Sequence, residues 1–135
     1  MSEDGLVTIA TRFSVEETID RLASVVTSRG MRVFARVDHA ATAAEVGMKL
    51  RPTHLLIFGS PRGGTPLMQD RQTTGIDLPL KALAWEDAGG RVWLTCNDSE
   101  WVARRHGLGA ASGDAVRAIA AGVAAVAAAA AGQPG

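Results

Sequence analysis

The chain has little or none of several features that mark common classes of protein. Its 135 residues include a single cysteine, Cys96, so no intramolecular disulfide can form, as is typical of a reducing compartment. The 14 basic and 14 acidic residues cancel, so no net charge attracts nucleic acid or an anionic membrane. The first residues are acidic and lack the basic and apolar regions of a secretion signal. We therefore expect a cytoplasmic protein that binds neither nucleic acid nor membrane.

Long apolar segments are also missing from most of the chain. The exception is residues 118–131, an uncharged, alanine-rich run that is shorter than the roughly 20 residues needed to span a bilayer. Because alanine has the highest helix propensity, we expect this run to be a helix and not a membrane anchor. The chain length suits one hydrophobic core. We predict a single α+β domain over residues 1–132 and a disordered tail over residues 133–135.

Hydrophobic periodicity and turn residues predict the element order β-α-β-α-β-α-β-β-α-α. The expected strands are residues 6–13, 32–38, 55–58, 78–86 and 91–97. The expected helix caps are Ser14, Thr42, Thr65, and Asp98 or Ser99, and the last helix is expected to start around Ser112. Strict alternation over residues 32–38 places Val33, Ala35 and Val37 on one face. The uniformly apolar run 55–58 is typical of an interior strand covered on both faces.

The late hairpin, which turns at residues 87–90, and the unequal helix lengths favour an α+β fold over a doubly wound sheet. We expect a five-stranded, mainly antiparallel sheet with the two longer helices, the first and the last, packed on one face. Short helices fill the connections. The expected core consists of Val15, Ile19, Leu22, Val26, Leu55, Ile57, Leu94, Ile119 and Val123.

Residues 59–66, here called the Gly/Pro segment, have the sequence Gly-Ser-Pro-Arg-Gly-Gly-Thr-Pro. A glycine-rich turn before a helix can bind an anion through backbone amides, with Arg62 beside them. The segment lacks the Gly-Lys-Ser/Thr ending of a P-loop and the glycine spacing of a dinucleotide-binding site. The alternative is a structural turn that needs glycine for its backbone conformation.

Few side chains carry recognisable chemistry. His39 ends an expected strand, where functional groups often lie, although a structural hydrogen bond is the more frequent role. The three histidines lack the spacing of a helical metal site, and Cys96 is distant from all of them in sequence. Met68 could ligate haem iron, although methionine more often fills a gap in a core. A thiol buried in a strand, as expected of Cys96, is inert.

Several motifs resemble the domain of unknown function 302 family. They are Val37-Asp38-His39-Ala40, Leu50-Arg51-Pro52-Thr53, Ile57-Phe58-Gly59, Gly64-Thr65-Pro66-Leu67-Met68-Gln69, Asp77-Leu78-Pro79-Leu80-Lys81, Trp85-Glu86-Asp87, Gly90-Arg91-Val92-Trp93 and Arg104-Arg105-His106-Gly107-Leu108. The resemblance covers nearly the whole chain except the alanine-rich tail. It implies a small α+β domain, a symmetric homodimer and no established activity, and some relatives have been linked to haem. It favours a shared site at the matched positions His39, Thr65, Met68, Asp77 and Lys81.

The chain departs from the usual family pattern at four positions, which are Ser60, Gly63, His54 and Cys96. Asparagine is expected in place of Ser60, alanine in place of Gly63, glutamate in place of His54 and an aromatic residue in place of Cys96. These departures weaken a catalytic role for Cys96 or His54.

The leading hypothesis is a homodimeric, non-enzymatic module that holds a small anionic or apolar ligand near the Gly/Pro segment. The candidate ligand-binding residues are His39, Arg62, Thr65, Met68, Asp77 and Lys81. Apolar contacts to the ligand or to a second subunit could come from Phe34, Trp85 and Trp93. The alternatives are a small enzyme with His39 as general base, and haem or metal binding through His39 or Met68. These hypotheses rest on one expectation, that His39 and the Gly/Pro segment converge on one cavity.

Overall fold

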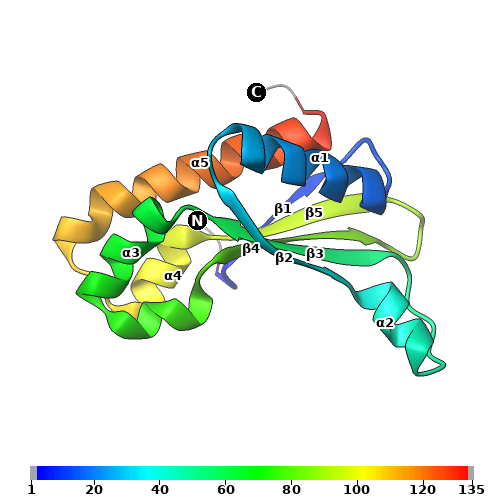
Figure 1. The fold of residues 1–135 in the computed structure, drawn as a ribbon, viewed down its shortest axis with the longest axis horizontal. Helices are drawn as coiled ribbons and strands as arrows, with labels where there is room; N and C mark the ends of the chain where they lie inside the picture. The colour runs from blue at the N-terminus through cyan, green and yellow to red at the C-terminus, as the bar shows by residue number, and fades with distance from the viewer. Residues whose placement is uncertain (1–2, 134–135) are drawn as a thin grey trace.

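The computed structural model describes residues 3–133 and confirms the α+β fold and the expected order of strands and helices (Figure 1). The strands are β1 (Leu6–Ala10), β2 (Arg32–Asp38), β3 (Thr53–Gly59), β4 (Leu80–Glu86) and β5 (Val92–Asn97). The α-helices are α1 (Val15–Ser28), α2 (His39–Glu45), α3 (Pro61–Asp70), α4 (Ser99–His106) and α5 (Gly113–Ala131). Two 3-10 helices, η1 (Gln72–Asp77) and η2 (Ala110–Ser112), lie in the connections.

The strands form one five-stranded antiparallel sheet in the order β1-β5-β4-β3-β2. As expected, α1 and α5 lie side by side on one face of this sheet (Figure 1). Ser14 caps α1, because its hydroxyl accepts a hydrogen bond from the amide of Glu17 at 3.1 Å. The predicted apolar stripe of α1 is buried against the sheet and consists of Val15, Ile19, Leu22 and Val26.

The core face of β3 carries Leu56 and Phe58, which are 0% and 1% exposed. The expectation that Leu55 and Ile57 lie in the core is wrong, and the strand is covered by helices on one face only. A uniformly apolar strand has no alternation, so its sequence does not specify which set of alternate residues faces the helices. The neighbouring strands supply the rest of the buried face through Ala82, Ala84, Leu94 and Cys96.

A β-bulge changes the faces of β2. The pairing with β3 shifts between Val33 and Ala35, which leaves Phe34 as the extra residue. Val33 lies opposite Phe58 on the core face, whereas Ala35 lies opposite Ile57 on the other face. The predicted common face of Val33 and Ala35 is therefore wrong, because the bulge reverses the alternation. Phe34 itself remains 45% exposed.

Two helices begin earlier than their predicted caps. The carboxylate of Asp38 accepts a hydrogen bond from the amide of Ala41 at 2.9 Å, so α2 starts after Asp38 and Thr42 lies inside the helix. Helix α3 starts after Ser60 and contains Thr65, the expected cap. Most of the Gly/Pro segment is therefore the first part of a helix and not a turn that precedes one.

The hairpin between β4 and β5 is confirmed, and Asp87 holds its turn. One carboxylate oxygen of Asp87 accepts hydrogen bonds from the amides of Gly89 and Arg91, at 2.9 and 3.0 Å. The other accepts from the indole nitrogen of Trp93 at 2.9 Å. The bond from Trp93, followed by the bond from the Arg91 amide, holds the pKa of Asp87 below its usual value.

The last helix is longer than the run counted from sequence. The segment Ala110–Ala131 has 22 residues and a mean hydropathy of 1.6, which by length and composition suffices to cross a membrane. The expectation that it is too short is therefore wrong. In the fold, α5 packs against α1, α3 and α4, and 28% of its apolar window is buried. Of the expected disordered tail, residues 134–135 lie outside the described residues, and Gln133 donates to the carbonyl of Ala10 at 2.6 Å.

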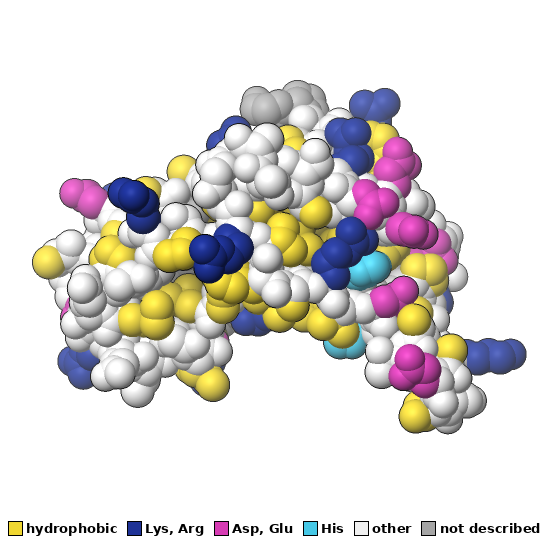
Figure 2. Space-filling view, viewed as in Figure 1, with side chains coloured by type: hydrophobic (Ala, Val, Ile, Leu, Met, Phe, Trp, Pro, Cys, Tyr) yellow, Lys and Arg dark blue, Asp and Glu magenta, His cyan; other side chains and the backbone are white. Residues whose placement is uncertain are grey.

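The sheet face opposite α1 and α5 is covered by no helix in residues 3–133. This open sheet face carries Val37, Leu55, Ile57, Leu83, Trp85 and Trp93. Residues 39–52, here called the α2 arm, project from one end of the sheet, and α3, η1 and α4 lie beyond the other end (Figure 1). In Figure 2 the outline of the molecule is hollowed between these two ends.

Candidate ligand-binding cavity

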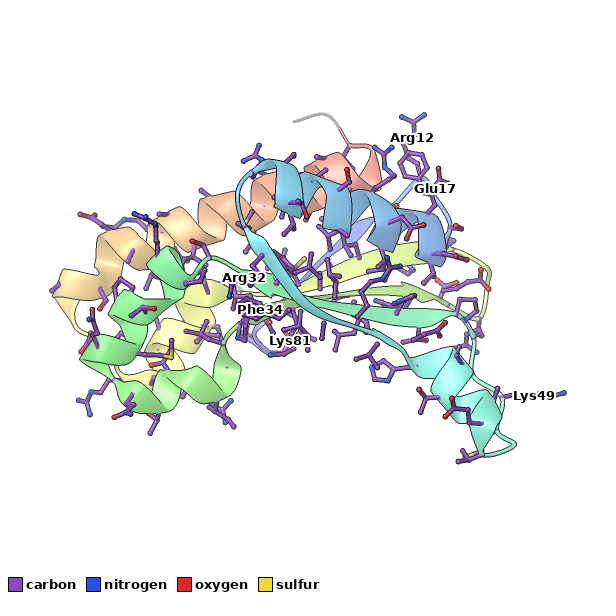
Figure 3. All side chains as sticks on the ribbon, in the orientation of Figure 1. Arg12, Glu17, Arg32, Phe34, Lys49 and Lys81 are labelled. Carbon is purple, nitrogen blue, oxygen red and sulfur yellow. The ribbon has the colours of Figure 1, made fainter. Side chains whose placement is uncertain are left out.

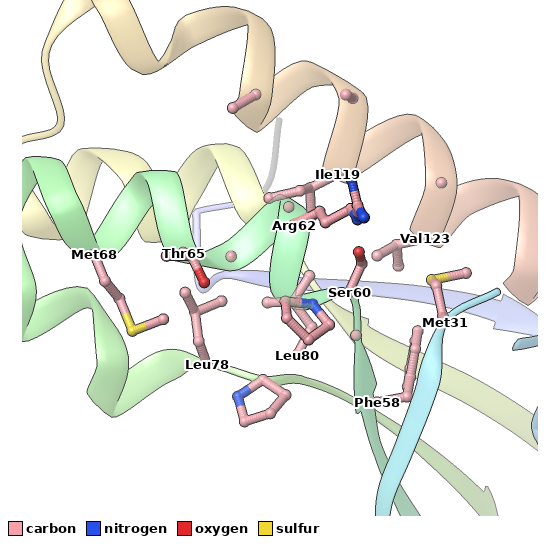
Figure 4. Close-up of a pocket in the computed structure, with 18 of the residues that line it drawn as sticks. Met31, Phe58, Ser60, Arg62, Thr65, Met68, Leu78, Leu80, Ile119 and Val123 are labelled. Atoms are coloured by element: carbon pink, nitrogen blue, oxygen red, sulfur yellow. The ribbon is translucent and has the colours of Figure 1, made fainter.

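A cavity of about 560 Å³ lies between α3, α5 and the ends of β2, β3 and β4 (Figure 4). Phe58 and Leu80, at adjoining ends of β3 and β4, supply part of its wall. Met31, just before β2, lies on one side, and Ile119 and Val123 of α5 lie above in the view of Figure 4. This volume is within the range of small-molecule sites in proteins. We call it the α3–α5 cavity.

Three glycines, which have no side chain, leave space for the cavity. Gly63 and Gly64 on α3 and Gly122 on α5 all line it. A Cβ atom at Gly63 would contact Ile119, and one at Gly64 would contact Leu78, so α3 lies close to both of these side chains. A Cβ atom at Gly122 would meet no atom within 4 Å. Gly122 therefore faces open space, and an added Cβ atom at this position would meet no clash.

The polar groups of the cavity come mainly from the first turns of α3. Ser60, Arg62 and Thr65 line it, and Arg62 is exposed. The amides of Gly63 and Gly64 donate to the carbonyl of Ser60, at 3.0 and 2.9 Å, so they are not free to bind an anion. Arg62 is the one charged residue of the lining in the described part of the chain. The side chains, and not a nest of backbone amides, therefore give the cavity its polar character.

Three of the six predicted ligand-binding residues meet at this cavity, which are Arg62, Thr65 and Met68. The expectation that His39 converges with them is wrong. Strands β2 and β3 are antiparallel, with Asp38 opposite His54, so the end of β2 meets the beginning of β3. His39 follows β2 and the Gly/Pro segment follows β3, and the two therefore lie at opposite ends of the sheet (Figure 1).

Asp77 and Lys81 lie near the cavity but do not line it. Asp77 accepts hydrogen bonds from His106 Nε2 at 2.6 Å and from Arg105 Nη1 at 3.1 and 3.2 Å. These bonds join η1 to α4, beside Leu78, which does line the cavity. The His106 side chain is only 8% exposed, whereas the Arg105 side chain remains 51% exposed.

Lys81 lies on the open sheet face and donates to the carbonyl of Pro79 at 3.4 Å. Of the three aromatic residues expected to contact a ligand or a second subunit, Phe34 lines the cavity and the other two lie on the open sheet face. Those two, Trp85 and Trp93, have ring centroids 6.4 Å apart. The aromatic residues are thus divided between two surfaces.

A carboxylate outside the cavity lining joins two of the surrounding helices. Asp70, the last residue of α3, accepts hydrogen bonds from the Ser112 hydroxyl at 2.7 Å and from the Gly109 amide at 2.9 Å. The Ser112 hydroxyl, and then the Gly109 amide, lower the pKa of Asp70. Because Ser112 immediately precedes α5, these bonds join α3 to α5, the two helices that form the cavity walls.

Sequence reasoning missed Met31, Leu78, Ile119 and Val123 as lining residues. The last two were assigned to the core. Both are only partly buried, and Val123 packs against the core as well as lining the cavity. The four residues come from three regions distant in sequence, so only the folded chain brings them together. A weak signal existed in the glycine at position 122, since a glycine inside a helix costs about 1 kcal/mol and therefore suggests a packing or functional reason.

The donor atoms available for a metal or haem are few. Within residues 3–133 no group of three or more His, Cys, Asp or Glu side chains could hold a metal ion. The described lining of the cavity contains two thioethers, Met31 and Met68, and no histidine. Cys96 is confirmed as a buried thiol, and burial raises its pKa to about 12. The donor set therefore suits an apolar ligand better than a metal.

Comparison with known proteins gives the family. The chain matches the family described as "Domain of unknown function DUF302" over residues 7–126, and it belongs to that family. A crystal structure of an uncharacterized conserved DUF302 protein from Bacillus stearothermophilus has the same fold, with a TM-score of 0.75 and 19% identity, over 95% of this chain and 96% of that one.

Curated relatives are longer. Proteins of Brucella suis and Brucella abortus, both named "Fluoride-specific ion channel FluC 1", are 55% identical to this chain over 131 residues. The match covers 97% of this chain but 52% and 48% of those proteins. The chain thus spans about half the length of the curated relatives it matches.

Proposed function

We propose that this chain is a cytoplasmic, homodimeric binding module whose ligand occupies the α3–α5 cavity. The observation that carries the proposal is the cavity itself, which has mostly apolar walls and three of the residues that the sequence indicated, Arg62, Thr65 and Met68. Ligand sites in proteins are typically apolar clefts with a few polar groups that fix orientation. The hydrogen bonds of Asp70 and Asp77 join elements around the cavity, which supports a preformed site.

The general-base hypothesis has less support. His39 begins α2 at the opposite end of the sheet from the cavity, and its side chain is exposed. It therefore lies too far away to remove a proton from a molecule held beside Arg62. Haem binding through His39 and Met68 together fails for the same reason.

The experiment fills the cavity from Gly122. In Gly122→Leu the new Cβ atom meets open space and the rest of the side chain occupies the cavity, so we expect the fold to be retained and the binding volume to be lost. The probe is the apolar fluorescent anion 1-anilinonaphthalene-8-sulfonate. We expect wild-type protein to bind it at one site per chain and Gly122→Leu to bind it at least about tenfold more weakly, because its apolar contacts are lost.

The matched control is Gly122→Ala, which adds a single methyl group and raises helix propensity. It should retain most of the probe binding and be at least as stable as the wild type. A second control, Ala121→Leu, adds the same side chain at an exposed position of α5. Equal probe binding by Gly122→Leu and the wild type would contradict the proposal.

A second copy of the chain is the partner that we propose for the open sheet face. Its apolar residues, including Leu55 and Leu83, are left without a covering layer by the described chain. Large apolar side chains are also exposed at both ends of this face. Val46 and Met48 on the α2 arm are 71% and 66% exposed, and Ile76 in η1 is 75% exposed.

An isologous dimer accounts for this arrangement. A two-fold axis through the middle of the open sheet face would place the α2 arm of one copy against the η1 end of the other. Val46 and Met48 would then contact Ile76 of the partner subunit. By symmetry this contact would occur twice in the dimer and would bury the exposed apolar groups of both copies. The homodimer that the family resemblance implies is thus supported by the surface.

We further propose that fluoride conduction, which the name of the longer relatives assigns to them, does not reside in the half that this chain matches. A conducting protein must satisfy its backbone in the bilayer with several helices or a closed barrel. In residues 3–133 one helix has a spanning length, and it packs on α1 and the sheet. Liposomes reconstituted with the purified chain should release fluoride no faster than empty liposomes, and faster release would refute this.

A further inference from the structure

The shape and charge of the α3–α5 cavity narrow the class of ligand. Its α5 wall extends from Ala115 to Val123, about 12 Å at the rise of an α-helix. Along this length the described lining of α5 is Ala, Ile, Gly and Val, with no polar side chain. An elongated wall of small and aliphatic side chains favours a flexible hydrocarbon chain over a compact polar metabolite.

The methionines suit the same occupant. Met31 and Met68 lie on opposite sides of the cavity in Figure 4, and both contribute thioether groups to its lining. Methionine is unbranched and adapts its shape to irregular apolar surfaces, so it accepts chains of different conformation. Phe58, which lies below Met31 in the view of Figure 4, adds a rigid apolar surface to the lining.

The charges lie at the rim and have one sign. Arg62 is exposed, and in the described part of the chain the cavity lining includes no Asp or Glu. A second cation lies beside the rim, because the guanidinium of Arg32 is 5.7 Å from the ring centre of Phe34, which lines the cavity. Figure 3 shows Arg32 and Phe34 together on β2. The rim is thus positive where the interior is apolar.

From this arrangement we propose that the ligand is a single-chain amphiphile with an anionic head group, such as a fatty acid. The inference rests on the proposed function and specifies its ligand. The hydrocarbon chain occupies the space between α3 and α5, where it is removed from water. The head group stays at the rim, since a buried carboxylate without a full set of partners would be costly.

Arg62 is the residue that recognises the head group. A guanidinium binds a carboxylate with two parallel hydrogen bonds, and the hydroxyl of Ser60, which caps no amide in α3, is available beside it. Because Arg62 is exposed, its pairing is screened by salt and contributes modestly to affinity. Most of the binding free energy therefore comes from the hydrocarbon chain of the ligand, and the preference for an acid over an alcohol depends on Arg62.

The test compares decanoate with 1-decanol, which share the chain and differ in the head group. Binding is measured by isothermal titration calorimetry below the solubility limit of each. We expect wild-type protein to bind decanoate about fivefold more tightly than 1-decanol at low salt, which corresponds to an exposed ion pair. Arg62→Gln should remove this preference by weakening decanoate alone, and 0.5 M NaCl should reduce it in the wild type.

Arg71→Gln is the matched control, because Arg71 ends the same helix and does not line the cavity. It should keep the preference, and Gly122→Leu should lose both ligands. Equal binding of the two probes, or a preference unchanged in Arg62→Gln, would overturn the anionic head group while leaving the cavity as a binding site. If neither probe binds and the fluorescent anion also fails to bind, the proposed function itself is wrong.

Discussion

At the scale of single residues, burial determines the chemistry of Cys96. Its side chain faces the core between β5 and the helices and is 4% exposed. Burial disfavours the thiolate, so the pKa rises from 9.0 to about 12. The folded chain therefore keeps this proton at pH values where the unfolded chain loses it. Below pH 9 both states are protonated and the difference has no effect on stability.

The first prediction follows from this difference. Between about pH 9 and 12 the unfolded chain binds fewer protons, so the free energy of unfolding should fall by about 1.4 kcal/mol per pH unit. Few other groups interfere, since the chain has no tyrosine and its two lysines are Lys49 and Lys81. Urea unfolding at several pH values measures the slope. Cys96→Ala should lack most of it, and equal slopes in the two proteins would contradict the assigned burial.

Among the elements, β3 places two adjacent apolar residues, Leu56 and Ile57, on opposite faces of the sheet. Leu56 is fully buried against the helices, whereas Ile57 lies half-buried on the open sheet face. We predict that Leu56→Ala lowers the free energy of unfolding by about 2–5 kcal/mol and that Ile57→Ala costs about half of that or less. Urea unfolding makes the comparison, at a protein concentration low enough for sedimentation to show a monomer. A larger loss of stability in Ile57→Ala than in Leu56→Ala would contradict the assignment of Leu56 to the buried face and Ile57 to the open sheet face.

The same strand shows which elements a sequence can specify. Helix α1 was predicted together with its cap and buried stripe, because an amphipathic period and a Ser14 cap are both local signals. The buried face of β3 was not predicted correctly, because its four consecutive apolar residues do not alternate with polar ones. The start of α2 was also missed, since Asp38 and Thr42 can both cap a helix and only the competition between them decides.

At the scale of the whole molecule, strand direction decides which residues meet. The fold class followed from element order and the hairpin, which are readable from sequence. The candidate site followed only in part: Arg62, Thr65 and Met68 lie within one helix and therefore stay together in any fold. The position of His39 relative to the cavity depends on how β2 and β3 pair, and the position of Ile119 depends on where α5 crosses the sheet. Neither is encoded locally, so both were misplaced.

The α2 arm has few contacts that would hold it in place in a single copy of the chain. It contains a helix of seven residues with no buried side chain, followed by the exposed Val46 and Met48 (Figure 3 labels Lys49 beside this helix). Isolated helices of this length are marginal in water, so a monomer has little to hold the arm in place. Contact with a second copy across the open sheet face would supply the missing burial and would order the arm.

We therefore predict that the wild-type chain sediments as a dimer at tens of micromolar and that Leu55→Lys, which places a charge on the open sheet face, sediments as a monomer. Val7→Lys is the control, because Val7 is 49% exposed and lies opposite Cys96, on the helix-bearing side of the sheet. Hydrogen exchange should be slow in the α2 arm of the dimer and fast in Leu55→Lys, while α1 stays protected in both. A wild-type monomer, or an arm that exchanges equally fast in both proteins, would contradict the proposed dimer.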